Sequence, residues 1–179
     1  MKWLALFSQT GSELKHIIEQ TGRKPHKAIV NRLGPTEIDG LVNVVREPNG
    51  LNVDTYNYYF SKYDIITLHG YLKIIPAEAC NHLIYNGHPA AIHLYPELKG
   101  KDKQEDAFSH KDKYPRMGVV IHRVTPELDS GEIVMSMDVE NTTTSIEDAY
   151  KKLAELSVFQ WVSFIRERPK MGEAVCKLR

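Results

Sequence analysis

Short apolar runs, each bounded by polar or turn-forming residues, recur along the first half of the chain. Runs of this length without a polar face are typical of buried strands in a parallel sheet. They cover Trp3–Phe7, His26–Val30, Leu41–Val45, Asp64–Leu68 and Asn81–Tyr85. Apolar residues at helical spacing follow the first run and recur over residues 56–63. Strands that alternate with helices predict an α/β domain with a mostly parallel sheet and helices on both faces.

The second half of the chain follows a different pattern. Its two apolar runs, Met117–His122 and Glu132–Val139, are separated mainly by the turn-rich segment Thr125–Gly131. A parallel crossover needs about a dozen residues or more, so we expect these strands to pair antiparallel. Thr144–Glu147 has the pattern of a cap for a long amphipathic helix, and residues 170–175 are expected to add a short strand. The sequence thus predicts a single domain over residues 1–179.

Composition narrows the classes of partner. The chain has 179 residues, with 23 Lys and Arg against 23 Asp and Glu, so its formal net charge is zero. No basic excess indicates a nucleic acid polymer or a membrane surface, and small molecules are therefore the expected substrates. The N-terminal apolar run is too short to span a membrane. Two cysteines, Cys80 and Cys176, are too few for a disulfide framework, which favours a reducing cytoplasm.

A charged segment, residues 97–113, interrupts the apolar pattern. It contains lysines, aspartates and glutamates of both signs, and apart from Ala107-Phe108 it has no core pattern. Segments of this kind are typical of solvated loops or of lids that move over a site. The sequence therefore predicts a solvated loop or a mobile lid at residues 97–113.

Three small or polar segments follow predicted strands, at residues 8–12, 69–75 and 86–89. Ligands in open α/β sheets bind at the carboxyl ends of the strands, so we expect these segments to line one crevice. The first segment leads into a helix with Ser12 as its expected N-cap, and a helix start of this kind can hold a phosphate. An ordinary capped helix remains the alternative. Glu13 opposes anion binding unless its side chain points away.

The segment Asn86-Gly87-His88 carries the candidate chemistry. The preceding apolar run is expected to stop at the Asn86-Gly87 turn dipeptide, so that an amide and an imidazole leave the sheet together. An amide donor can stabilise a developing oxyanion, and an imidazole can hold or move a proton. On spacing alone, an ordinary loop histidine is the more common interpretation.

Asp129 is the candidate partner of His88. It lies in Glu127-Leu128-Asp129-Ser130-Gly131, a loop predicted at the same end of the sheet. A carboxylate there could raise the pKa of His88 or move a proton through water. A plain turn residue is the alternative, because Ser-Gly pairs favour turns.

The order of these motifs resembles the core of the folate-dependent formyltransferases. That family has an Asn-x-His-Pro motif, a strand that opens with Gly and carries a His, and a Leu-Asp-x-Gly motif. Here they correspond to residues 86–89, 118–122 and 128–131. Residues 8–14 resemble the family's phosphate loop, and residues 69–75 resemble its segment beside the pterin. The similarity covers nearly the whole chain and implies a Rossmann-like fold.

The resemblance also implies an activity: transfer of a formyl group from 10-formyltetrahydrofolate, the co-substrate, to an amine, without a metal. Asn86 would donate to the formyl oxygen, His88 would polarise the carbonyl and manage protons, and Asp129 would hold His88 and take the amine's proton. The implied folate contacts are Leu72, Lys73, Ile74, Ile75, Val124 and Asp129. The implied contacts with the acceptor are Gly11, Ser12, Glu13, Lys170 and Glu173.

The acceptor amine is less constrained. Family members that act on glycinamide ribonucleotide are the most similar, which implies that acceptor and a role in purine biosynthesis. Two features of the sequence favour a different amine as an alternative acceptor, such as an amino sugar nucleotide or a modified nucleotide. They are Glu13 and an abbreviated segment between Gly34 and Tyr63. A third hypothesis is a folate- or nucleotide-binding protein without catalysis. A monomer or homodimer is expected in each case.

Overall fold

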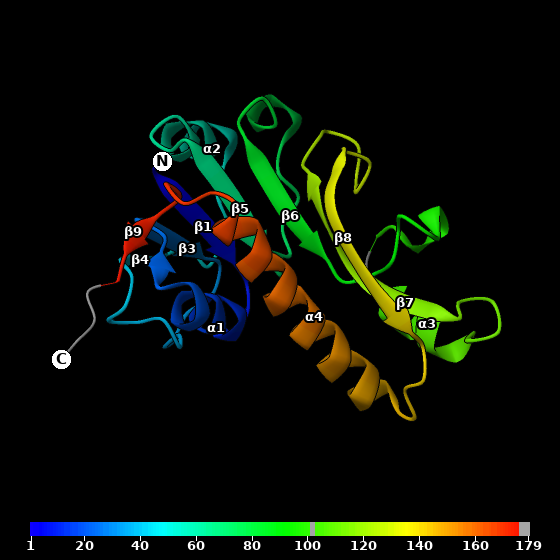
Figure 1. The fold of residues 1–179 in the computed structure, drawn as a ribbon. Coiled ribbons are helices and arrows are strands. Elements are labelled where there is room, and N and C mark those ends of the chain that lie inside the picture. Colours follow the sequence, from blue (N-terminus) through cyan, green and yellow to red (C-terminus); the bar gives the residue numbers. More distant parts are fainter. Residues whose placement is uncertain (101–102, 176–179) are drawn as a thin grey trace.

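A seven-stranded sheet forms the centre of the molecule (Figure 1). The computed structural model describes residues 1–100 and 103–175. The strands of the sheet are β1 (Trp3–Phe7), β3 (Lys27–Val30), β4 (Val44–Arg46), β5 (Ile65–His69), β6 (Ile84–His88), β7 (Arg116–Arg123) and β8 (Ile133–Glu140). Their order is β4-β3-β1-β5-β6-β7-β8. The first five run parallel, β7 pairs antiparallel with β6, and β8 pairs antiparallel with β7, as predicted.

Helices cover both faces of this sheet. The α-helices are α1 (Ser12–Thr21), α2 (Val53–Phe60), α3 (Lys103–Ser109) and α4 (Ile146–Arg166), with short 3-10 helices η1 (Ala77–Ala79) and η2 (Pro96–Leu98). Helices α1 and α4 lie side by side on one face, and α2 lies on the other (Figure 1). Two further short strands, β2 (Arg23–Lys24) and β9 (Glu173–Ala174), pair as a small antiparallel sheet. This pairing confirms the predicted final strand.

The alternation of side chains on β1 explains this layering. Successive residues of a strand point to opposite faces, and all five residues of β1 are buried. Trp3, Ala5 and Phe7 pack in the cluster that contains α1 and α4, whereas Leu4 and Leu6 pack with α2. The apolar run therefore predicts a central strand correctly.

Helix α4 begins where the sequence predicts. Ser145 is its N-cap, and the Ser145 hydroxyl accepts a hydrogen bond from the backbone N–H of Asp148 at 3.1 Å. This contact satisfies one of the donors that the first helical turn leaves without a partner. The helix then runs across the sheet, and the fully buried Trp161 packs onto it.

Strand β6 is longer than predicted. The sequence interpretation ends the strand before Asn86, but β6 continues through Asn86 and Gly87 to His88. Gly87 is not a turn residue: a Cβ there would lie 2.7 Å from Nε1 of Trp161, so only glycine lets the helix approach this closely. Packing of α4 on the sheet thus overrides the local turn preference of Asn-Gly. As a result, Asn86 and His88 are held by strand hydrogen bonds.

The charged segment is also more ordered than predicted. Residues 97–100 and 103–113 include the end of η2 and all of α3, and the side chains of Leu98 and Ala107 are buried. Residues 101–102 lie outside the described part. The prediction of a solvated loop is wrong for the described parts of this segment, because Leu98 and Ala107 join a small apolar cluster with Ala90 and Val120.

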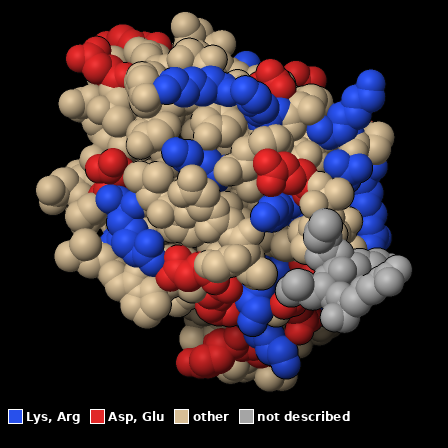
Figure 2. All heavy atoms as spheres, turned by 90° about the vertical axis from the view of Figure 1, so that its left-hand side faces the viewer, with Lys and Arg blue, Asp and Glu red and all other residues tan. Residues whose placement is uncertain are grey.

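Charges of both signs are interspersed at the surface. On the face shown in Figure 2, Lys and Arg side chains of the described residues lie next to Asp and Glu side chains. Within residues 1–100 and 103–175, none of the helices has the length and apolar character that crossing a membrane requires. Cys80 is buried with a free thiol, and Cys176 lies outside the described residues.

Candidate active site

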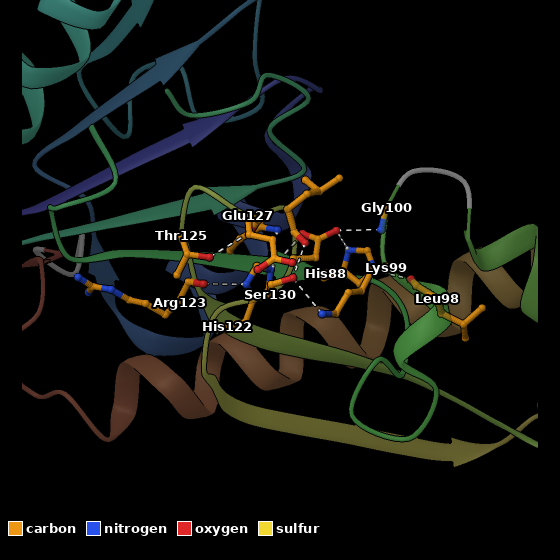
Figure 3. A network of polar contacts seen from close by, with 12 residues as sticks. His88, Leu98, Lys99, Gly100, His122, Arg123, Thr125, Glu127 and Ser130 are labelled. Carbon is orange, nitrogen blue, oxygen red and sulfur yellow. Dashed lines mark hydrogen bonds and ion pairs between the residues drawn. The ribbon is translucent and has the colours of Figure 1, made fainter. Parts of the chain in front are cut away.

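Strand register brings the predicted polar residues together. Asn86 and His88 are two residues apart on β6, so their side chains point to the same face. Strand β7 pairs with β6 so that His122 lies opposite Asn86. The loop between β7 and β8 carries Asp129 to the same place. Figure 3 shows His88 and His122 within one polar network, near Leu98, Lys99 and Gly100.

Asp129 lies between two histidines. Its Oδ2 is 3.4 Å from Nδ1 of His88, and its Oδ1 is 3.3 Å from Nε2 of His122. The backbone N–H of Gly100 donates to Oδ2 at 3.0 Å. Only 8% of the Asp129 side chain is exposed, and its backbone has a left-handed φ of 48°. Aspartate tolerates this conformation better than most residues, so the turn aims the carboxylate inward at modest cost.

The protonation of this cluster follows from burial and charge. Burial lowers the pKa of His88 because it penalises the imidazolium, although the charge of Asp129 and the Leu98 carbonyl oppose this effect. Burial would raise the pKa of Asp129, but its close contact with His122, the charge that His88 carries when protonated, and the Gly100 N–H together lower it. The structure therefore favours an ionised Asp129 beside a neutral His88 near pH 7.

The contacts of His88 identify the nitrogen that exchanges protons. Nε2 lies 3.0 Å from the carbonyl oxygen of Leu98, and a carbonyl can only accept, so Nε2 carries the hydrogen. In neutral His88, Nδ1 then has a lone pair directed toward Asp129. A proton arriving at Nδ1 would be stabilised at once by that carboxylate. The pair can therefore accept one proton.

His122 orients Asn86. Nδ1 of His122 donates to the carbonyl oxygen of Arg123 at 2.9 Å, so neutral His122 accepts at Nε2. The Asn86 amide nitrogen lies 3.1 Å from this Nε2 and donates to it. One amide hydrogen is used in this way, which leaves the second for a ligand. His122 lies within a sequence motif but is not among the predicted site residues, because only the β6–β7 register places it opposite Asn86.

The predicted folate contacts lie just after β5 and just after β7. Leu72 and Ile74 follow β5, and their side chains are 63% and 78% exposed, whereas Ile75 is buried. The Leu72 N–H donates to the Ser8 hydroxyl at 2.7 Å, which ties the segment to the loop after β1. Lys73 is exposed, and Val124 packs against the cluster that contains Ile75. Exposed apolar side chains here suit a flat aromatic ring system.

A cavity of about 260 Å³ opens at the carboxyl ends of β1 and β5. This is the place where the strand order reverses, and all three predicted loops contribute residues to its wall. Its lining residues are Phe7, Gln9, Gly11, Ser12, Glu13, Leu14, His69, Gly70, Gly87, Pro89, Gln104, Tyr150, Leu153, Ala154 and Ser157. The predicted crevice is confirmed.

The start of α1 forms one wall of this cavity and differs from the prediction in one respect. The N-cap of α1 is Gly11, with φ of 84° and no side-chain cap, so Ser12 is the first helical residue rather than the cap. Glycine at this position permits the left-handed turn that leads from β1 into the helix. Gly11, Ser12 and Glu13 all line the cavity, in agreement with their predicted position.

Glu13 does not point away from the cavity. Its Oε2 lies 2.9 Å from Nδ1 of His69, and its Oε1 accepts from the Ser157 hydroxyl at 2.5 Å. His69 is the last residue of β5, and Ser157 lies on α4, so three separate elements meet at this carboxylate. Ser157 is not among the predicted site residues, because it lies far from Glu13 in the chain.

Lys170 and Glu173 lie elsewhere. The Lys170 carbonyl oxygen accepts from the N-terminal amine of Met1, and Glu173 is in β9, which pairs with β2. Strand β2 follows the last turn of α1, about 15 Å from the first turn at the rise of an α-helix. Both residues are therefore at the amino ends of the strands, beside the N-terminus in Figure 1. The structure thus places Lys170 and Glu173 away from Gly11 and Ser12.

Metal ligands are not grouped in the described part of the chain. No three His, Cys, Asp or Glu side chains among these residues are arranged as a metal site would require. Asp129, with His88 and His122, forms an electrostatic and proton-holding cluster. The chemistry that it supports is proton movement beside an amide donor.

Comparisons with known proteins agree with this geometry. The formyl transferase family model matches residues 51–163, which include Asn86, His88, His122 and Asp129. Phosphoribosylglycinamide formyltransferase from Dictyostelium discoideum is 24% identical over 136 residues, covering 69% of this chain and 66% of that protein. Methionyl-tRNA formyltransferase from Thermotoga neapolitana is 29% identical over 114 residues, covering 62% of this chain and 34% of that protein. The chain thus spans less than two thirds of either relative.

Solved structures share the fold. The phosphoribosylglycinamide formyltransferase of Streptococcus pneumoniae has a TM-score of 0.78 at 21% identity, covering 94% of this chain and 99% of that chain. The corresponding enzyme of Campylobacter jejuni has a TM-score of 0.80 at 20% identity, covering 94% and 97%. The family match extends over more than half of the sequence, and this chain therefore belongs to the formyl transferase family.

Proposed function

We propose that this chain transfers the formyl group of 10-formyltetrahydrofolate to a primary amine on a small molecule. The observation that carries the proposal is the cluster of Asn86, His88 and Asp129 at the sheet end where the cavity opens. Membership of the formyl transferase family supports the same reaction. In this reaction the amine nitrogen bonds to the formyl carbon, the bond from that carbon to N10 of the folate breaks, and a proton passes from the amine to N10.

Asn86 is assigned to the formyl oxygen. As the amine adds to the carbonyl, this oxygen gains negative charge, and a fixed N–H donor stabilises that charge more than it stabilises the starting carbonyl. One N–H of the Asn86 amide is held by His122, so the group is already oriented and its second N–H is available. A single donor of this kind is typically worth about 3 kcal/mol of barrier.

His88 and Asp129 are assigned to the proton. The adding amine must lose a proton, and Nδ1 of His88, with Asp129 3.4 Å away, can take it. Direct polarisation of the formyl oxygen by His88 would require Nε2–H to leave the Leu98 carbonyl. The geometry therefore favours the proton-holding role of His88 over the carbonyl-polarising role.

The folate side is assigned to the segment after β5 and to Val124. Leu72 and Ile74 offer exposed apolar surface, and the backbone of Lys73 to Ile75 offers hydrogen-bonding groups for the pterin. When bound, 10-formyltetrahydrofolate supplies the activated formyl group.

Two candidates compete for the role of acceptor amine. Phosphoribosylglycinamide is the first compound to test, because the names of proteins similar in sequence and in fold include it. A different amine is the second candidate, and the carboxylate of Glu13 in the cavity wall favours it.

The test is a direct assay. The chain is incubated with 10-formyltetrahydrofolate and a panel of amines that includes phosphoribosylglycinamide, and formylated products are identified by mass spectrometry. We expect one amine to gain a formyl group at a rate that Asp129→Asn strongly reduces. Stabilisation by a folate analogue without transfer to any amine would instead indicate a binding protein without catalysis.

A further inference from the structure

The cavity next to the catalytic cluster carries negative charge where a phosphate-binding site needs positive charge. Among the described residues that line it, Glu13 is the acidic side chain, and no Lys or Arg lines it. Phosphate sites at helix starts depend on free backbone N–H groups and on cationic side chains. Here a carboxylate on the second residue of α1 occupies the position that an anion would approach.

Two hydrogen bonds hold the Glu13 carboxylate in this place. His69 approaches Oε2 with Nδ1, and Nε2 of His69 lies 2.8 Å from the Thr67 hydroxyl. The Trp3 indole N–H donates to the same hydroxyl at 2.7 Å, so the Thr67 hydrogen is free to point to Nε2. Neutral His69 then carries its hydrogen on Nδ1 and donates it to Glu13. The arrangement fixes the orientation of the Glu13 carboxylate in the cavity wall.

The carboxylate keeps capacity for a ligand. Two carboxylate oxygens can accept about four hydrogen bonds, and His69 and Ser157 account for two of them. The Glu13 side chain is 27% exposed, and it lines the cavity. A ligand in the cavity therefore meets an oriented acceptor with unused lone pairs.

We propose that Glu13, held by His69 and Ser157, selects an amine acceptor that presents hydroxyl or ammonium groups, and rejects an acceptor that presents a phosphate at this end. The inference rests on the proposed formyl transfer and names the class of its acceptor. Glu13 is thus a specificity-determining residue, and the amine to be formylated lies at the opposite end of the same molecule, toward Asn86 and His88.

Simple electrostatics sets the expected size of the effect. Two like unit charges about 5 Å apart, at an effective dielectric constant of about 20, disfavour binding on the order of 100-fold. Partial exposure of Glu13 to water reduces this effect, and we expect about 10-fold or more. Replacing the carboxylate with the isosteric amide should remove the discrimination and preserve contacts to His69 and Ser157.

Calorimetric titration of matched variants tests the proposal. The ligands are phosphoribosylglycinamide, the same compound without its phosphate, and inorganic phosphate. The variants are Glu13→Gln, Glu13→Ala and the control Glu19→Gln, which removes the same charge from an exposed position about 9 Å further along the same helix. Circular dichroism checks the fold of each variant.

We expect the unmodified chain to bind the unphosphorylated compound about 10-fold more tightly than the phosphorylated one. Both substitutions of Glu13 should abolish or reverse this ratio, and Glu19→Gln should retain it. Equal or tighter binding of the phosphorylated compound by the unmodified chain overturns the inference, as does an unchanged ratio in Glu13→Gln.

Should neither acceptor bind, inorganic phosphate decides the question. A phosphate Kd about 10-fold lower in Glu13→Gln than in the unmodified chain supports the inference, and equal affinity or no binding in both overturns it. Failure of the proposed function has a different signature: no amine in the panel is formylated, whatever the binding ratio. Different results would therefore contradict the proposed function and the inference about Glu13.

Discussion

Two histidines share one carboxylate at the candidate active site, and each has a distinct task. His88 places Nδ1 near Asp129 and uses Nε2–H on the Leu98 carbonyl. His122 accepts from Asn86 and approaches the other oxygen of Asp129. The amide donor and the proton-holding pair are therefore connected through His122. A change at any of these residues is expected to disturb the orientation of the others.

Asn86→Ala removes the proposed oxyanion donor. We expect kcat/KM to fall about 100-fold to 1,000-fold, since a single donor of this kind contributes about 3 to 4 kcal/mol to the barrier. Steady-state formyl transfer to the acceptor found in the amine panel measures the effect. Asn81→Ala, at an exposed position shortly before β6, is the matched control and should leave the rate unchanged. Near-normal turnover by Asn86→Ala would remove Asn86 from the mechanism.

The protonation of His88 predicts how stability depends on pH. Because burial lowers the pKa of His88 below its ordinary value of 6.5, the unfolded chain binds this proton at a higher pH than the folded chain. The stability from neutral His88 is therefore complete above about pH 7 and is lost as the pH falls through 6.5 toward the folded pKa. The pKa of Asp129 lies below 3.8, so Asp129 contributes to the pH dependence only in more acidic solution.

Urea unfolding between about pH 7 and about pH 5 checks this prediction. We expect the free energy of unfolding to fall on acidification, and to fall less steeply in His88→Asn than in the unmodified chain. His16→Asn, at an exposed position of α1, is the control and should keep the full slope. The same slope in His88→Asn would mean that His88 does not titrate abnormally.

At the scale of elements, the close approach of α4 to β6 supports the site. Trp161 of α4 lies over Gly87, the residue between Asn86 and His88. On the same helix, Ser157 reaches Glu13 at the start of α1. Helix α4 therefore positions residues of both the catalytic cluster and the acceptor-side cavity.

Gly87→Ala tests this approach. The new methyl group would lie 2.7 Å from Nε1 of Trp161, so either the helix or the indole ring must move. Overpacking of this kind typically costs about 1 to 3 kcal/mol, and we expect that loss in urea unfolding. We also expect a lower kcat, because the shift displaces Asn86 and His88. An unchanged unfolding free energy would show that the indole ring moves without cost.

Ser145→Ala tests the start of α4. Loss of the cap leaves the Asp148 N–H without its protein partner, and we expect a loss of about 1 kcal/mol in the free energy of unfolding. Thr144→Ala, one residue earlier, leaves the Ser145 cap in place and should change stability by less than about 0.5 kcal/mol. Equal effects of the two substitutions would contradict the assignment of Ser145 as the cap.

At the scale of the molecule, the sheet order decides where ligands meet. The chain leaves β1 toward β3 on one side and returns to β5 on the other, and the cavity opens at this reversal. Strand β7 runs antiparallel to β6, places His122 opposite Asn86, and leads into the loop from which Asp129 contacts His88. Residues from distant parts of the chain therefore lie close together at this end of the sheet.

Ligand binding should stabilise the whole domain. A folate analogue that binds only the folded chain is expected to add about 2.7 kcal/mol to the free energy of unfolding at a concentration about 100 times its Kd. A thermal-shift series with rising analogue concentration measures this effect. Asn86→Ala should retain most of the shift, because Asn86 is assigned to the reacting carbonyl rather than to the pterin. Absence of any shift in the unmodified chain would contradict the proposed folate site.

Much of the fold follows from local sequence. Buried parallel strands are read from unbroken apolar runs such as Trp3–Phe7, and the capping pattern at Ser145 marks the start of α4. Short separation makes β7 and β8 antiparallel neighbours. These features depend on residues close together in the chain, where periodicity and turn chemistry act directly.

The sequence by itself also determined the convergence of three loops at one sheet end and the identity of Asn86, His88 and Asp129 as candidates. Other features of the site depend on contacts in the tertiary structure. Packing against Trp161 kept Gly87 in β6, register placed His122 opposite Asn86, and α4 brought Ser157 to Glu13. It also separated Lys170 and Glu173 from the cavity. Contacts between residues distant in sequence depend on how whole elements pack, and no local pattern encodes that packing.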